Sequence, residues 1–297
     1  MSDLYNATVL SVRYPQKNLM IFRVKPDKKI PPFKPGQYFT LGLGYWEPRI
    51  LGSGTEVLKE GQETRLCKRP YSLSDPILMD SKLIKSDTEW LEFYVALVEP
   101  SEDNPAPALT PRLFCLKGGE RIFISEKAMG HYTLDLLDGV FPKQLLFAST
   151  GTGEAPHNAM IRWLLLNGYK GKILNVTCSR RQGDHCYLEV HQELEKMFLG
   201  YRALALSTRE AKQKKLYIQD LIAENLLKDM VDFELDPEST HVFLCGNPAM
   251  VGAPKKNRES GQWEWAISGG VVEMLVKKGF VVDEPKKHGN IHFENYW

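Results

Sequence analysis

The pattern of apolar residues changes near residue 140, and this change constrains the fold more than any other feature of the sequence. Before it, short runs of branched and aromatic residues are separated by turn signals such as Pro35-Gly36, which is typical of an antiparallel barrel. After it, continuous apolar runs alternate with segments of helical spacing, a pattern that favours a right-handed parallel sheet. We therefore predict two domains, a six-stranded antiparallel β-barrel over residues 1–138 and a parallel-sheet α/β domain over residues 139–297.

The expected elements follow from local spacing. The strands expected in the first domain are residues 5–14, 19–24, 38–44, 69–73, 91–99 and 121–125. A short helix is expected over residues 109–116, with Thr110 as its N-cap and Pro111 at its first helical position. Residues 45–63 show no helical period and are expected to form a loop or a hairpin. The second domain is expected to contain strands at 144–148, 172–178, 203–207 and 241–245, and helices at 157–166, 187–198, 216–227 and 270–278.

The composition limits the classes of function that the chain can serve. Hydrophobic residues make up 43% and charged residues 25%, as in soluble globular proteins. The net charge of +1 implies neither a nucleic-acid partner nor a membrane surface. From Met1 to Lys68, however, there are eleven Lys and Arg against six Asp and Glu. This excess fits a basic face for an acidic protein partner, and it fits scattered solvated charges equally well.

The cysteines and the N-terminal segment indicate the compartment. The five cysteines are widely spaced: Cys67, Cys115, Cys178, Cys186 and Cys245. None forms a C-x-x-C pair or a cluster with iron–sulfur or zinc spacing, so no metal site is expected and a reducing cytoplasm is favoured. The N-terminal segment lacks the pattern of a signal peptide, and no apolar run approaches the length of a membrane span. We expect a soluble cytoplasmic protein with no membrane segment.

A glycine-rich turn, Gly151-Thr152-Gly153, lies between an expected buried strand and an expected helix. Small residues let a ligand approach the backbone, and Pro156 presets the first helical turn. The unpaired N–H groups of the helix start and its dipole would then face a pyrophosphate. The alternative is a turn with only a structural role, because the segment is not the usual G-x-G-x-x-G.

Two arginines follow the ends of neighbouring expected strands. Ser179-Arg180 ends the second strand of the parallel domain, and Thr208-Arg209 ends the third. Ligands of open parallel sheets bind beyond the carboxyl ends of the strands, where arginine favours the 2′-phosphate of NADP(H) over the free ribose of NAD(H). The alternative is a pair of solvated arginines.

Three further segments contain side chains suited to a flat, anionic cofactor. In Arg69-Pro70-Tyr71-Ser72 a guanidinium would clamp a phosphate while the ring and the hydroxyl contact a ring system; the alternative is a surface arginine on an ordinary barrel strand. In Cys245-Gly246-Asn247-Pro248 the glycine permits close approach and the proline suits a helix start; the alternative is that Cys245 is only a small buried hydrophobe. The aromatic end, Tyr296-Trp297, would dock on a flat cofactor; the alternative is a final strand packed on the core.

The motifs Arg-x-Tyr-Ser, Gly-Thr-Gly-x-Ala-Pro and Cys-Gly-x-Pro, in this order and followed by a terminal Tyr-Trp, resemble those of the bacterial-type ferredoxin–NADP⁺ reductases, a family of flavoenzymes. The matches run from about Pro35 to Trp297. The resemblance implies that FAD is bound by Arg69, Pro70, Tyr71, Ser72, Tyr94, Val95, Ala96, Ala108, Leu109, Thr110, Thr152, Tyr296 and Trp297. It implies that NADP(H) is bound by Gly151, Thr152, Gly153, Ser179, Arg180, Thr208, Arg209, Cys245, Gly246, Asn247, Pro248 and Met250.

The resemblance also implies a reaction. NADPH transfers a hydride to FAD beside Ser72, Cys245, Glu294 and Tyr296, and FAD exchanges single electrons with ferredoxin or flavodoxin. In the family, the terminal tyrosine stacks on the flavin, and the following tryptophan lies near the adenine. We expect a monomer. Two alternatives remain: an NADH-preferring reductase, such as a cytochrome b₅ reductase type enzyme or an oxygenase reductase component, and a non-catalytic flavin-binding electron-transfer subunit.

The chain departs from the family pattern in places. The departures are the segments 45–63, 99–108 and 252–268, and the absence of a clear arginine within Lys215–Gln219. We expect the three segments to alter a partner surface or an edge and to leave the redox centre unchanged. The missing arginine bears on the affinity for NADP(H).

Overall fold

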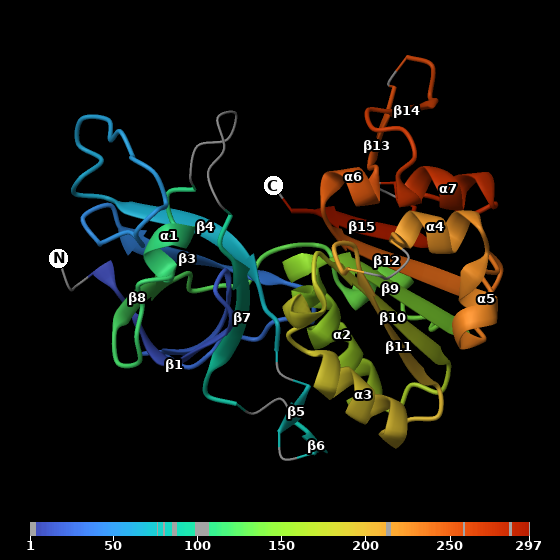
Figure 1. Ribbon diagram of the computed structural model, residues 1–297, viewed down its shortest axis with the longest axis horizontal. Helices are drawn as coiled ribbons and strands as arrows, with labels where there is room; N and C mark the ends of the chain where they lie inside the picture. The colour runs from blue at the N-terminus through green and yellow to red at the C-terminus, as the bar shows by residue number, and fades with distance from the viewer. Residues whose placement is uncertain are drawn as a thin grey trace.

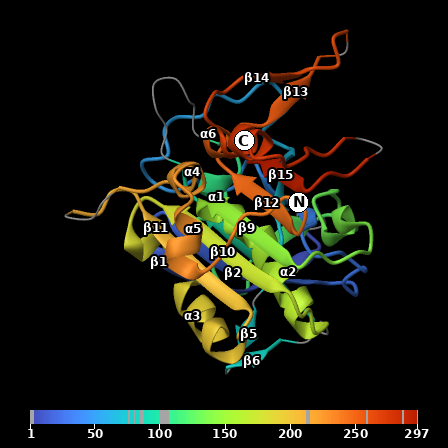
Figure 2. The same ribbon diagram turned by 90° about the vertical axis from the view of Figure 1, so that its right-hand side faces the viewer.

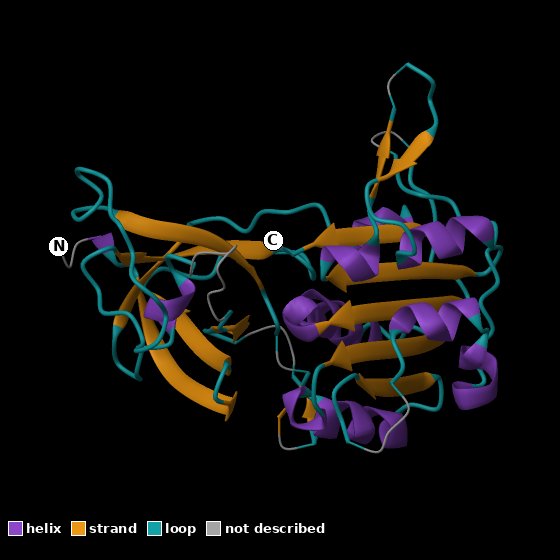
Figure 3. Ribbon diagram, turned by 45° about the horizontal axis from the view of Figure 1, so that its top comes forward, coloured by secondary structure: helices purple, strands orange, loops and turns teal. Residues whose placement is uncertain are grey.

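The computed structural model describes residues 4–75, 77–79, 81–84, 88–98, 107–211, 215–257, 259–284 and 287–296. Within these ranges the chain forms two halves of different class (Figure 1). In Figure 3 the first half consists mostly of strands, whereas strands and helices alternate in the second. The arrowheads of the parallel strands in Figure 3 point toward the first half, so their carboxyl ends face the barrel.

The first half is a six-stranded antiparallel sheet with the order β4-β3-β8-β1-β2-β7. Its strands are β1 (Ala7–Gln16), β2 (Leu19–Pro26), β3 (Tyr38–Gly44), β4 (Leu66–Ser72), β7 (Leu91–Ala96) and β8 (Arg121–Ile124). An isolated bridge between Leu73 and Phe93 joins the two outer strands and closes the sheet into a barrel. Alternate residues fill the interior, where the rings of Phe22 and Phe93 lie 5.5 Å apart. The predicted six-stranded barrel is confirmed.

The second half is a five-stranded parallel sheet with the order β11-β10-β9-β12-β15, which Figure 2 shows side by side. Its strands are β9 (Gln144–Thr150), β10 (Lys172–Ser179), β11 (Tyr201–Ser207), β12 (Thr240–Gly246) and β15 (Ile291–Asn295). Its helices are α2 (Glu154–Leu166), α3 (Leu188–Met197), α4 (Ile218–Ala223), α5 (Leu226–Val231), α6 (Pro248–Val251) and α7 (Val271–Lys277). Helices α2 and α3 pack on one face, and the other four pack on the opposite face. The predicted parallel sheet is confirmed.

The remaining elements are short. They are α1 (Thr110–Leu113), the 3₁₀ helices at Leu134–Leu137, Gly151–Gly153 and Gln182–Asp184, and the hairpins β5 (Leu78–Met79) with β6 (Lys82–Leu83) and β13 (Pro254–Lys256) with β14 (Trp263–Trp265). Neither hairpin was predicted from the sequence. The β13–β14 hairpin falls within segment 252–268 and projects from the second half (Figure 1). Residues 45–63 form no regular element, as expected of a loop.

Two sequence-based expectations are wrong. The helix predicted over residues 216–227 is two helices, α4 and α5, because Asn225 adopts the left-handed conformation with φ of 56° and interrupts the helical path. The N-cap of α1 is Leu109, and Thr110 is the first helical residue. The Thr110 hydroxyl makes no capping bond, because it is hydrogen-bonded to Tyr71 instead.

Two further features concern membranes and metal ions. Among them, no helix has both the length and the apolar character needed to cross a bilayer. In the same part of the chain, no group of three or more His, Cys, Asp or Glu side chains is placed to hold a metal ion.

Candidate active site

A cavity of about 440 Å³ lies between the barrel and the carboxyl ends of the parallel strands. On the barrel side, β4 and β7 contribute the predicted residues Arg69, Pro70, Tyr71, Ser72, Tyr94, Val95 and Ala96. Thr110 of α1 completes that side, and Thr152, Glu294 and Tyr296 line the other. Segments far apart in the sequence therefore converge on one space, as the motifs predicted.

Not every residue predicted for FAD lines this cavity. Leu109 is fully buried in the barrel core, and Ala108 packs against that core. Both residues support the turn that presents Thr110. Trp297 lies outside the described residues, as does most of the segment 99–108.

The four residues predicted for catalysis meet at one corner of the cavity. The Tyr296 hydroxyl is buried beside the Ser72 hydroxyl and the Cys245 thiol and interacts with both side chains. The Tyr296 backbone N–H donates to the Gly246 carbonyl at 2.9 Å. Glu294 is the direct neighbour of Cys245, because β15 pairs with β12 in that register. The end of the chain therefore joins a barrel residue to a parallel-sheet residue.

The protonation states at this corner follow from burial. Burial raises the pKa of Glu294 to about 7. Its Oε2 atom is buried and has no hydrogen-bond partner among the described residues. Burial, with the Glu294 carboxylate second, raises the pKa of Cys245 well above its usual value, so the thiol stays neutral. The corner therefore contains one group, Glu294, that gains or loses a proton near neutral pH.

The β4 edge presents a guanidinium and a phenol to the cavity. Arg69 is exposed, and its Nη1 donates to the Lys68 carbonyl at 2.8 Å. Arg69 forms no ion pair with a described residue, so its charge is available to an anion. The Tyr71 hydroxyl lies 3.0 Å from Thr110 Oγ1, and burial raises the pKa of Tyr71 to about 12. Tyr71 is therefore a neutral hydrogen-bonding group.

The glycines of the second domain serve two purposes. Gly151 has φ of 53° and open space where a side chain would stand, so this turn is accessible to a ligand. A Cβ atom on Gly153 would collide with the Cys245 carbonyl, and one on Gly246 would collide with Thr150. These two glycines allow the β9 and β12 loops to cross in contact, a reason that differs from the ligand approach predicted from sequence.

The two predicted 2′-phosphate arginines lie side by side. The Arg209 backbone N–H donates to the Arg180 carbonyl at 2.7 Å, and the Thr208 N–H donates to the Ser179 carbonyl at 3.1 Å. Both arginines are exposed, and neither forms an ion pair with a described residue. The two arginines thus follow the ends of adjacent strands at neighbouring backbone positions.

The residues after β12 have clear structural roles. Asn247 caps α6, since its side chain accepts a hydrogen bond from the Ala249 N–H at 2.8 Å. Pro248 is the first residue of that helix, as the sequence predicted. Met250 is buried in the core of the parallel sheet. Core packing is therefore sufficient to account for Met250.

Sequence reasoning assigned no role to Glu154, which the structure places in a buried network. Its Oε1 lies 2.7 Å from His191 Nε2, and the other ring nitrogen of His191 lies 2.7 Å from the Tyr201 hydroxyl. This network ties α2 to α3 and β11 directly behind the glycine-rich turn. An acidic residue in a first helical turn is common, and its histidine partner is 37 positions away, so no local pattern indicated the pair.

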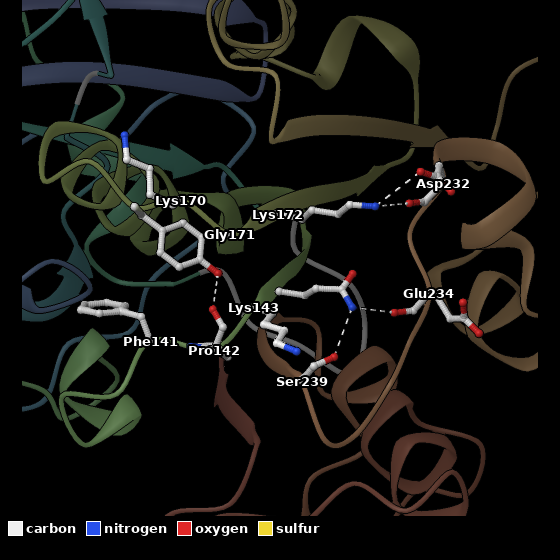
Figure 4. Close-up of a pocket in the computed structure, with 11 residues that line it drawn as sticks. Phe141, Pro142, Lys143, Lys170, Gly171, Lys172, Asp232, Glu234 and Ser239 are labelled. Atoms are coloured by element: carbon white, nitrogen blue, oxygen red, sulfur yellow. Dashed lines mark hydrogen bonds and ion pairs between the residues drawn. The ribbon is translucent and has the colours of Figure 1, made fainter.

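A larger hollow lies elsewhere. It has a volume of about 700 Å³ and includes Lys143, Gln144 and Lys172, at the amino ends of β9 and β10 (Figure 4). Figure 4 shows Lys172 directed at Asp232. The Tyr169 hydroxyl donates to the Pro142 carbonyl at 2.8 Å. Because Cys245, Thr152 and the strand-end arginines lie at the opposite ends of the strands, this hollow is not the candidate site.

Comparison with known proteins gives consistent matches. Residues 147–256 match the family described as Oxidoreductase NAD-binding domain. The chain is 28% identical over 303 residues to the flavodoxin/ferredoxin–NADP reductase of Buchnera aphidicola subsp. Schizaphis graminum, covering 100% of both chains. It is also 28% identical over 235 residues to the protein of that name from Escherichia coli (strain K12), covering 78% of this chain and 81% of the relative.

Solved structures show the same fold. A ferredoxin NADP⁺ reductase from Neisseria gonorrhoeae, with bound FAD and NADP, superposes with a TM-score of 0.72 at 19% identity and 98% coverage of both chains. The barrel, the parallel sheet and the cavity between them define the class of the fold, an antiparallel barrel followed by a parallel α/β sheet. The resemblance to the ferredoxin–NADP⁺ reductase family, predicted from three short motifs, is confirmed.

Proposed function

We propose that this protein is an FAD-dependent oxidoreductase that transfers hydride between NADP(H) and FAD, and single electrons between FAD and ferredoxin or flavodoxin. The observation that carries the proposal is the corner where Tyr296 joins Ser72 to Cys245. This corner places a hydroxyl, a neutral thiol and a titratable carboxyl beside one cavity that both domains line. We further propose that residues 1–138 hold FAD and residues 139–297 hold NADP(H), in a cytoplasmic monomer.

The cavity fits a flavin by chemistry and by size. Its volume of about 440 Å³ lies within the range of small-molecule sites. Arg69 offers an exposed guanidinium to a phosphate, and the buried Glu294 Oε2 has no hydrogen-bond partner in the part of the chain that the structure describes. A buried acceptor without a donor is costly, so a ligand or water that donates to Glu294 would relieve that cost. FAD, when bound, accepts the hydride of NADPH and releases electrons singly.

The protein's own residues position the reactants and exchange a proton. Because the Tyr296 ring fills the space beside Ser72 and Cys245, a nicotinamide ring entering this corner has to displace it. Displacement frees the Ser72 hydroxyl to bond the flavin and leaves Cys245 as a neutral wall beside the nicotinamide. Glu294 Oε2 gains or releases a proton near neutral pH. Arg180 and Arg209 hold the 2′-phosphate of the nucleotide and set its preference.

The test is electron transfer from NADPH to a one-electron carrier. The purified protein, with FAD bound, is mixed with NADPH and either a flavodoxin or a ferredoxin, and reduction of the carrier is followed by absorbance. Turnover that depends on both NADPH and the carrier supports the proposal. A kcat/KM for NADH above that for NADPH would favour the NADH-preferring alternative, and equal values would contradict the role given to Arg180 and Arg209. Bound FAD that NADPH does not reduce would favour the non-catalytic alternative.

A further inference from the structure

The connection from β4 to β7 leaves the barrel and packs against the second domain. Ile77 is buried in the same core cluster as Ile161 and Leu164 of α2. The small β5–β6 hairpin that follows contributes Leu78 and Leu83 to the edge of that cluster. Figure 1 shows this hairpin beside the second half. The segment directly after Ser72 is therefore part of the interface between the domains.

A buried ion pair joins this connection to α2. Arg162 and Asp75 are each only 5% exposed, and the Arg162 Nη2 group is paired with Asp75 Oδ2. The Nη1 group of the same guanidinium donates to the Ile84 carbonyl at 3.0 Å. Arg162 thus contacts both ends of the segment 75–84, which contains the β5–β6 hairpin. Asp75 itself adopts the left-handed conformation, with φ of 47°.

A second set of buried hydrogen bonds crosses the interface beside the ion pair. The Ser74 hydroxyl donates to the Tyr187 hydroxyl at 2.7 Å, and the Tyr187 hydroxyl donates to Glu92 at 3.1 Å. Asn158 of α2 donates its amide to Ser74 at 3.5 Å. These side chains anchor the residue next to Asp75 to α2 and to the start of α3.

Such a pair is a poor means of adding stability. Removing two charges from water costs several kcal/mol, and apolar residues of similar volume usually stabilise a core as well or better. Burial raises the pKa of Asp75 to about 6, and Arg162 opposes that rise, so the carboxylate remains ionised at neutral pH. A directional contact at this place therefore points to a requirement for geometry.

The two partners belong to elements that form opposite sides of the candidate active site. Asp75 follows Ser72 by three positions along the chain. Arg162 lies about two helical turns after the start of α2, which begins directly after Gly151–Gly153. The pair thus links the barrel wall of the cavity to the helix that carries the glycine-rich turn. It uses residues that none of the sequence motifs includes.

We propose that Asp75 and Arg162 are positioning residues for hydride transfer, whose ion pair holds Ser72 in register with the Gly151–Gly153 turn. This inference rests on the function proposed above. Neither side chain lines the cavity, so each acts only through the elements that it joins. Loss of the pair leaves both half-sites intact and changes their relative placement.

The test compares Asp75→Asn with the wild type in the FAD-loaded protein. FAD content, the dissociation constant for NADPH and the rate of FAD reduction are measured by absorbance and stopped-flow mixing. FAD content is expected to be unchanged, and the dissociation constant for NADPH is expected to change less than about threefold. The rate of FAD reduction is expected to fall about 10- to 100-fold, because a displacement of the reacting groups by about 1 Å slows a reaction by about that factor. The long-wavelength charge-transfer band between NADPH and flavin is expected to weaken in parallel, a readout of ring placement that does not require turnover.

Matched variants separate positioning from general damage. Arg162→Lys keeps the charge and is expected to retain a rate between those of the wild type and Arg162→Met. Asp27→Asn, which removes an arginine–carboxylate pair within the barrel (to Arg121), is expected to match the wild type. Should Asp75→Asn not fold, the order of the two Arg162 variants decides the question.

A folded Asp75→Asn or Arg162→Met protein that reduces its flavin at the wild-type rate, with the wild-type charge-transfer band, would overturn the inference. A wild-type protein that binds no FAD or does not oxidise NADPH would instead overturn the proposed function. The two failures are therefore distinguishable.

Discussion

The preference for NADPH over NADH depends, in this account, on two exposed arginines at neighbouring strand ends. The perturbation is Arg180→Ala, Arg209→Ala and the double variant. A 2′-phosphate carries about −1.5 to −2 charges at neutral pH. The backbone bond of 2.7 Å from Arg209 to Arg180 brings both residues close enough to share one phosphate. NADH lacks this phosphate, so only NADPH should lose affinity.

The magnitude follows from the exposure of the two side chains. A hydrogen bond to a charged group contributes about 1.5–3 kcal/mol, and solvent screening at an exposed site reduces this to about 1–1.5 kcal/mol for each arginine. Each single variant is therefore expected to lower kcat/KM for NADPH about tenfold, since about 1.4 kcal/mol corresponds to a factor of ten. The double variant should lose about 30- to 100-fold, somewhat less than the product, because both arginines serve one phosphate.

The assay is steady-state oxidation of NADPH and of NADH with ferricyanide as acceptor, at low and at high ionic strength. The value of kcat/KM for NADH is expected to stay within about twofold of the wild type, and added salt should weaken NADPH use by the wild type more than by the double variant. Arg202→Ala is the matched control, because Arg202 is an exposed arginine near the opposite end of β11. Equal losses for NADPH and NADH in the double variant would refute the reasoning.

Three further predictions concern the corner of the site. Burial raises the pKa of Glu294 to about 7, so the stability that protonated Glu294 gives the folded state is complete below its unfolded pKa and is lost as pH rises through about 7. Between about pH 5 and about pH 8, the wild type should lose roughly 2 kcal/mol more of its free energy of unfolding than Glu294→Gln, as measured by urea titration. Equal losses would contradict this prediction. Tyr296→Ser should raise the affinity for both nicotinamide nucleotides and reduce discrimination between them, as measured by difference absorbance titration, because the phenol occupies the corner. If the affinities are unchanged, Tyr296 does not block the site. Gly153→Ala should lower the free energy of unfolding by about 2 kcal/mol or more, because the added methyl group meets the Cys245 carbonyl, and a stability equal to that of the wild type would show that the loops separate easily.

The class of the fold could be predicted because it depends on the local spacing of apolar residues along the sequence. Antiparallel strands with one exposed face and buried parallel strands have different apolar periods, and each period is visible within a few residues. The break between α4 and α5 was missed because the apolar period continues across it. Asn225 was the available signal, since asparagine adopts the left-handed conformation more readily than most residues.

In residues 291–296, both structures that the sequence left open are present together. The sequence left open a final strand packed on the core or an aromatic tail docked at a cofactor. Residues Ile291–Asn295 form the strand β15, and Tyr296, one residue further, lies beside Ser72 and Cys245. The register of β15 on β12 places Glu294 beside Cys245 as well. The strand thus determines where the tail arrives.

The buried polar pairs could not be predicted. Asp75 and Arg162 are 87 positions apart, and Glu154 and His191 are 37 apart. Neither pair has a local pattern, because the first contact forms only when the barrel connection packs on α2 and the second only when α2 packs beside α3. The sequence suggested that glycine at 153 and 246 admits a ligand, whereas the structure gives a different reason for both glycines, the crossing of two loops.

The central claim is that FAD occupies the cavity between the barrel and the parallel sheet. The most direct measurement is the absorbance spectrum of the purified protein. The bound ligand is then released by heating the protein and is identified by mass spectrometry. The account predicts the two bands of oxidised flavin and one FAD per chain, with bands that change on substitution of Ser72 by alanine. A colourless protein that takes up no FAD on reconstitution would contradict it.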